Sequence, residues 1–83
     1  MTAHYTVTMV RPEFEGETTR SITLTEPADV VSLRQLAGFL THLLFRDNER
    51  GGPNTFYTIT ERIGDKLKVF TVERGSSPHY FHS

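Results

Sequence analysis

The residues of this sequence that are best suited to metal chemistry are its four histidines, two of which lie close together near the C-terminus. His79 and His82 carry imidazole nitrogens that can bind a transition metal, but two ligands fill at most half of a tetrahedral zinc site. His4 and His42 belong to other segments and would have to converge on the same point. We therefore expect His79 and His82 to be incidental residues of the C-terminal tail, and the sequence predicts no metal site and no cofactor.

Acid–base or nucleophilic chemistry has equally little support. A general base such as Glu61 or His42 would have to lie in a pocket where burial shifts its pKa, and Glu61 already has Lys68 as its expected partner in a hairpin. Ser76 and Ser77 lack the glycine-flanked turn that presents a nucleophilic serine. The sequence also contains no phosphate-binding loop, no dinucleotide-binding glycine pattern and no zinc-protease helix motif. We therefore predict that the chain is not an enzyme.

Composition and charge argue against several other functional classes. The chain has 83 residues, a net charge of −1 and no cysteine. Nucleic-acid-binding proteins usually carry a clear basic excess and acidic DNA mimics a clear acidic one, so neither class is favoured. The lack of cysteine excludes disulfides and thiol chemistry and fits a cytoplasmic protein. No basic segment followed by an apolar run opens the sequence, and no stretch approaches about 20 apolar residues, so we expect neither export nor a membrane span.

The elements that would position these side chains begin with a β-hairpin. Residues 5–10 alternate apolar side chains with threonines, which is the period of a half-buried strand. Residues 19–24 alternate in the same way and follow a loop that contains proline and glycine. The register that we predict places Val7 opposite Ile22, because this pairing gathers the large apolar side chains on one face.

A second hairpin is predicted between residues 56–63 and 66–73. Gly64 is the first residue of its two-residue loop, which suits a type II′ turn and pairs Ile63 with Lys66. The pairs that follow along the ladder are Arg62–Leu67, Glu61–Lys68, Thr60–Val69, Ile59–Phe70, Thr58–Thr71 and Tyr57–Val72.

Between the hairpins, the spacing of residues predicts a helix that begins at Leu33. Ser32 and Gln35 have the spacing of a capping box, in which the serine hydroxyl accepts from the amide of Gln35 and the glutamine reaches back to the amide of Ser32. Val31 and Leu36 occupy the positions of a hydrophobic staple across the same cap.

A start near Pro27 is the alternative for this helix. A cluster of turn residues at positions 47–54 ends it. The helical period gathers one apolar stripe, which we expect to cover the sheet and which consists of Leu33, Leu36, Ala37, Leu40, Leu43 and Leu44.

Together these elements predict an α+β fold in the chain order ββαββ. The sheet has four antiparallel strands and carries one amphipathic helix on one face. Residues 1–75 form a single domain in this prediction, and residues 76–83 form a C-terminal tail that we expect to be flexible. The order of the strands within the sheet does not follow from the sequence.

One flank of the helix offers a candidate interface. Phe45 projects away from the apolar stripe, and a large exposed aromatic often marks a contact. Gly38 lies on a similar flank with Arg34 and Thr41, and a glycine inside a helix costs about 1 kcal/mol relative to alanine unless a second backbone approaches it. The alternative is that Phe45 packs beneath the loop at residues 51–52 and that Gly38 is merely tolerated.

The outer face of the sheet is the other candidate. Alternation places hydroxyl side chains on it, namely Thr6, Thr8, Thr19, Ser21, Thr23, Thr58, Thr60 and Thr71. Four apolar residues interrupt them: Val10, Phe56, Leu67 and Val69. Such a face could stack against a second sheet or bind an extended chain, although threonine is also simply favoured at solvent-facing strand positions.

From these observations we expect a small, non-catalytic and regulatory protein-interaction module that forms a homodimer or occupies the surface of another protein, with no membrane partner. A nucleic-acid-associated accessory protein is the first alternative, and it would use Arg11, Arg20, Arg34, Arg46, Arg50 and Arg62. A small-molecule or metal-binding domain that uses His79 and His82 is the second alternative.

Overall fold

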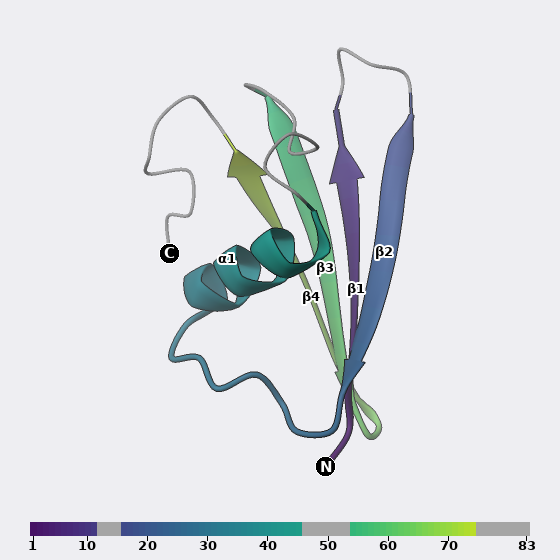
Figure 1. The fold of residues 1–83 in the computed structure, drawn as a ribbon, viewed down its shortest axis with the longest axis vertical. Helices are drawn as coiled ribbons and strands as arrows, with labels where there is room; N and C mark the ends of the chain where they lie inside the picture. Colours follow the sequence, from purple (N-terminus) through teal and green to yellow (C-terminus); the bar gives the residue numbers. More distant parts are fainter. Residues whose placement is uncertain (12–15, 46–53, 75–83) are drawn as a thin grey trace.

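The computed structural model describes residues 1–11, 16–45 and 54–74. Its elements follow the order β1 (Ala3–Val10), β2 (Glu17–Leu24), α1 (Leu33–Leu44), β3 (Thr55–Ile63) and β4 (Lys66–Arg74). The four strands form one antiparallel sheet in the order β2-β1-β3-β4 (Figure 1). The predicted ββαββ fold is therefore confirmed. The predicted tail and its histidines, His79 and His82, lie outside the described residues.

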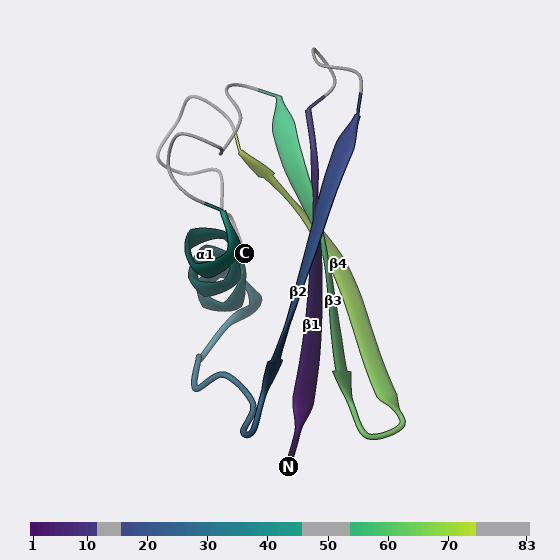
Figure 2. The same ribbon diagram turned by 45° about the vertical axis from the view of Figure 1, so that its right-hand side comes forward.

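The helix lies on one face of the sheet, against β1 and β2. Figure 2 shows α1 to one side, with no described element on the other side of the strands. The strand order results from the crossover, because the chain leaves β2 at one edge, passes through α1 and returns as β3 beside β1. The two central strands therefore come from different hairpins.

Alternation along the central strands determines which side chains enter the core. In β1 every second residue from Ala3 to Met9 is buried, and in β3 the same holds from Thr55 to Ile59. The buried apolar residues are Ala3, Tyr5, Val7, Met9, Leu36, Ala37, Leu40, Phe45, Tyr57 and Ile59. Because all of the strand members point toward α1, the sheet has one covered face and one uncovered face among the described residues.

The β3–β4 hairpin has the register that its turn predicts. Ile63 lies opposite Lys66, and Glu61 lies opposite Lys68 at 3.8 Å between carboxylate and ammonium. Gly64 has a φ of +62°, whereas its neighbour in the turn has no positive φ. This combination is the one that a type II′ turn requires, and it favours glycine at the first turn position.

The predicted register of the β1–β2 hairpin is wrong by two residues. Ile22 lies opposite Tyr5, and Val7 lies opposite Arg20. A shift of two residues keeps every side chain on its predicted face, so the pattern of apolar residues does not distinguish the two registers. The observed register is decided by tertiary contacts: the Arg20 guanidinium donates to the carbonyl of Leu44 at 2.7 Å, at the C-terminal end of α1.

The helix begins at Leu33, as predicted, but its cap differs in detail. The Ser32 hydroxyl accepts from the amide of Gln35 at 3.2 Å, whereas the Gln35 side chain accepts from the amide of Val31 at 3.0 Å rather than from that of Ser32. The predicted staple is absent, because Val31 is 87% exposed while Leu36 is buried.

The buried stripe of the helix also differs from the predicted one. Leu33 and Leu43 are 43% and 47% exposed, whereas Thr41 is fully buried. The Thr41 hydroxyl donates to the carbonyl of Ala37 at 2.8 Å, which explains how a polar side chain can lie in the core. The face that meets the sheet is therefore rotated toward the flank on which we expected an interface.

Phe45 is a core residue, so the prediction that it is an exposed contact is wrong. Its side chain is 1% exposed, and its ring centroid lies 5.9 Å from that of Tyr57. The Arg20 guanidinium lies over the same ring at 4.9 Å. Phe45 is the C-cap residue, with an extended backbone, and this change of direction turns its side chain from the flank of the helix into the core.

Candidate interaction surface

The uncovered side of the sheet, which we call the open face, carries side chains from all four strands in four parallel rows. The register across β2, β1, β3 and β4 defines each row. The basic row consists of Thr23, His4, Arg62 and Leu67. The first middle row consists of Ser21, Thr6, Thr60 and Val69, and the second consists of Thr19, Thr8, Thr58 and Thr71. The acidic row, at the opposite end, consists of Glu17, Val10, Phe56 and Glu73. The structure thus brings together on one face all of the hydroxyl residues predicted for it.

Hydroxyl groups on the open face pair across β1 and β2. The Thr8 and Thr19 hydroxyls lie 2.9 Å apart, and those of Thr6 and Ser21 lie 3.2 Å apart. In the basic row, the Thr23 hydroxyl lies 3.0 Å from a ring nitrogen of His4. A polar group that already has a hydrogen-bond partner is less costly to cover than an unpaired one. This part of the open face is therefore suited to burial against another surface.

The other half of the open face carries exposed apolar side chains on the edge strand β4. Leu67 is 64% exposed and Val69 is 56% exposed. Phe56, on the neighbouring strand β3, is half-buried. These are the residues from the predicted interface that share one surface. An exposed apolar pair beside neutral hydroxyls is a combination that interaction surfaces use.

The ionisable side chains of the open face are segregated to its two ends. Arg62 and His4 lie in the basic row, and Glu17 and Glu73 lie in the acidic row at the opposite end. The two middle rows contain no ionisable side chain. This polarity was not predicted, although strand parity together with the β3–β4 register was enough to place Arg62 and Glu73 at opposite ends of one face.

The remaining residues of the predicted interface lie on α1, on the other side of the sheet. Arg34 is exposed and Gly38 is half-buried, but Thr41 and Phe45 are both buried in the core. The structure therefore does not join these four residues to Phe56, Leu67 and Val69. A contact surface built around Phe45 is excluded by its burial.

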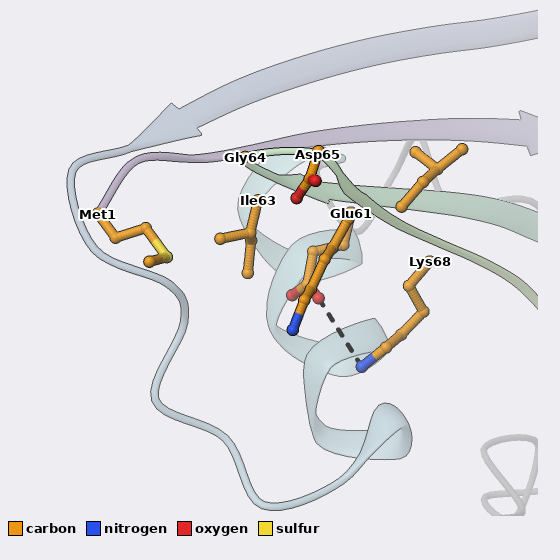
Figure 3. Close-up of a pocket in the computed structure, with 8 residues that line it drawn as sticks. Met1, Glu61, Ile63, Gly64, Asp65 and Lys68 are labelled. Atoms are coloured by element: carbon orange, nitrogen blue, oxygen red, sulfur yellow. Dashed lines mark ion pairs between the residues drawn. The ribbon is translucent and has the colours of Figure 1, made fainter.

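A pocket of about 740 Å³ lies beside the turn between β3 and β4 (Figure 3). In Figure 3, Met1 and Ile63 line one side, and the ion pair of Glu61 with Lys68 lines the other. A smaller pocket of about 430 Å³ shares Glu61, Ile63 and Lys68 and continues toward the segment that leads into α1.

Tyr5 is a buried residue that contacts Ala28 and Glu61, two of the residues that line the smaller pocket. Its hydroxyl accepts from the amide of Ala28 at 3.1 Å. Burial raises the pKa of Tyr5 above its ordinary value of 10.0, the hydrogen bond from Ala28 opposes this increase, and the carboxylate of Glu61 adds to it. Glu61 interacts with both Tyr5 and Lys68. We therefore infer that these side chains stabilise the packing of the segment before α1 and of the β3–β4 hairpin against β1.

The part of the chain that the structure describes contains no group of three potential metal ligands among histidine, aspartate and glutamate. Within the same residues, α1 is too short to cross a bilayer. No protein-family model, no curated protein and no solved structure matches this chain.

Proposed function

We propose that this chain is a non-catalytic protein-interaction module that binds a protein partner through its open face. The observation that carries the proposal is the exposure of Leu67 and Val69, 64% and 56%, on a sheet face that also carries paired hydroxyls on β1 and β2 and that no described element covers. Such a module acts by occupying the surface of its partner, and it needs no reactive group to do so. We assign it to the cytoplasm, a compartment that a cysteine-free chain fits.

The limited size of the core supports the proposal. A single helix on one face of a four-stranded sheet leaves the other face without a hydrophobic layer, and a chain of this size can build only one small core. Association adds buried area to the folded state alone, so a bound partner also stabilises the fold.

The test compares two lysine substitutions at apolar positions of similar exposure. Val69→Lys changes the open face, and Leu43→Lys changes a residue of α1 that is 47% exposed on the other side of the sheet. Each tagged chain is incubated with an extract of its native cell and, separately, with untagged chain, and the retained protein is quantified by mass spectrometry. We expect the wild type and Leu43→Lys to retain the same partner and Val69→Lys to lose at least about nine-tenths of it, because a lysine ammonium resists burial at an interface.

The folded state of each variant is checked by circular dichroism before binding is compared. Equal retention by Val69→Lys and the wild type would contradict the proposal, as would a wild-type chain that retains no protein under either condition.

A further inference from the structure

We infer that the occupant of the open face is a second copy of this chain, stacked face to face with its strands antiparallel to those of the first. This inference rests on the proposed function and specifies its partner. It describes a symmetric dimer in which the two-fold axis lies between the sheets and runs perpendicular to the strands. Symmetric two-fold association is the commonest assembly of soluble homo-oligomers, and paired sheets stack with their strands within about 30° of each other.

The distribution of charge selects this orientation. A two-fold axis perpendicular to the strands reverses the order of the rows, so the basic row of one copy lies over the acidic row of the other. Arg62 then lies over Phe56 of the second copy, which Glu73 of that copy flanks. A guanidinium gains from both an aromatic face and a carboxylate.

The alternative two-fold axis, parallel to the strands, superposes like charges. It keeps the order of the rows and reverses the order of the strands, so the carboxylate of Glu17 lies over that of Glu73 of the second copy. Like charges that face each other disfavour an interface. The open face is therefore complementary to itself in the antiparallel orientation alone.

The middle rows are suited to the centre of such an interface. In the antiparallel orientation the row of Thr6 and Val69 lies over the row of Thr8 and Thr71, and no charge has to be buried. The hydroxyls of Thr6 and Thr8 already have partners on β2. The centre therefore combines the exposed apolar side chain of Val69 with four hydroxyls on β1 and β2 that need no new partner.

The area of the open face matches what a specific dimer needs. Eight residues along a strand span about 26 Å and four strands span about 19 Å, so the flat area is on the order of 500 Å². Side-chain relief makes the accessible area larger than the flat area, and specific interfaces begin at about 600 Å² per partner.

The test is a reciprocal charge exchange, with association measured by light scattering across a concentration series. The variants are Arg62→Glu, Glu73→Arg and the double variant, and Arg34→Glu on the exposed surface of α1 is the matched control. We expect the wild type to reach twice the 9.5 kDa mass of the monomer. Each single exchange should raise the dissociation constant of the dimer by about tenfold or more, because it places like charges close to each other across the interface.

The double variant should return to within about threefold of the wild type, and Arg34→Glu should leave the dissociation constant unchanged. Tighter association of Glu73→Arg would indicate the parallel axis, because it would place an arginine over Glu17 of the second copy, and would overturn the inference, as would a dimer that none of the exchanges affects. A wild-type chain that stays monomeric at every concentration would also overturn it, yet it would leave the proposed function standing if the extract supplies a different protein that Val69→Lys fails to retain.

Discussion

Phe45 joins the end of α1 to the sheet, and its removal should be among the most damaging single changes in the chain. The residue is 1% exposed, and its ring contacts both Tyr57 and the Arg20 guanidinium. We expect Phe45→Ala to lower the free energy of unfolding by about 3–5 kcal/mol, through lost apolar burial and a residual cavity. Phe39, which is 42% exposed on the same helix, is the control, and Phe39→Ala should cost about 1 kcal/mol or less. Urea denaturation measures both, and equal losses would show that Phe45 is not a core residue.

Tyr5 should make the stability of the fold sensitive to alkaline pH. Burial raises its pKa in the folded state above the ordinary value of 10.0, which the unfolded chain retains. The stability that depends on a neutral Tyr5 is therefore fully present below about pH 10 and is lost as the pH rises through the folded-state pKa, because the unfolded chain releases its proton first.

Urea denaturation at pH 8 and at pH 11 tests this expectation. Tyr5→Phe should be less stable than the wild type at pH 8, since the amide of Ala28 loses its acceptor, but it should lose less stability between the two pH values. An identical pH dependence in the two proteins would mean that the phenol of Tyr5 is not the group responsible.

At the scale of the element, the start of α1 depends on Ser32. Its hydroxyl accepts from the amide of Gln35 at 3.2 Å, and no acidic residue lies in the first turn to supplement it. Ser32→Ala should lower the free energy of unfolding by about 1 kcal/mol, whereas Ser32→Asp should preserve it because aspartate caps equally well. Thermal denaturation followed by circular dichroism measures the change. Equal losses in the two variants would show that the hydroxyl is not acting as a cap.

The two hairpins differ in how far the turn of each one determines its register. In the β3–β4 hairpin, two turn residues with glycine first leave one register, and the observed pairs are the predicted ones. In the β1–β2 hairpin, residues 11–16 connect Val10 to its partner Glu17, and a loop of that length allows registers that differ by two residues. The contacts of Arg20 with Leu44 and Phe45 at the end of α1 favour the observed register.

At the scale of the whole molecule, the strand order β2-β1-β3-β4 places the polar residues of both hairpins on a single continuous surface. Within this surface the register of β3 with β4 separates Arg62 from Glu73 along the strands, so the two residues lie at opposite ends of the open face. Either hairpin alone would present a strip two strands wide, too narrow for a specific interface. The proposed interaction surface is thus a property of the assembled sheet.

Local patterns in the amino-acid sequence were enough to determine the elements of this protein. Three local features each act within a few residues: the alternation of β1 and β3, the serine cap of α1 and the glycine of the β3–β4 turn. Their structural consequences can therefore be predicted without knowledge of the tertiary contacts. The hydroxyl composition of the outer face and the positions of Leu67 and Val69 on it follow from the same strand parity.

Tertiary structure alone decided the strand order, the register of β1 with β2 and the burial of Phe45. Each depends on contacts between segments that are distant along the chain: the crossover places β3 beside β1, Arg20 reaches the end of α1, and Phe45 meets Tyr57. Helical periodicity could not locate Phe45, because the backbone leaves the helix at that residue and turns the ring toward the sheet. Long-range packing selected among the alternatives that local patterns allow, and it left one face of the sheet uncovered by any described element.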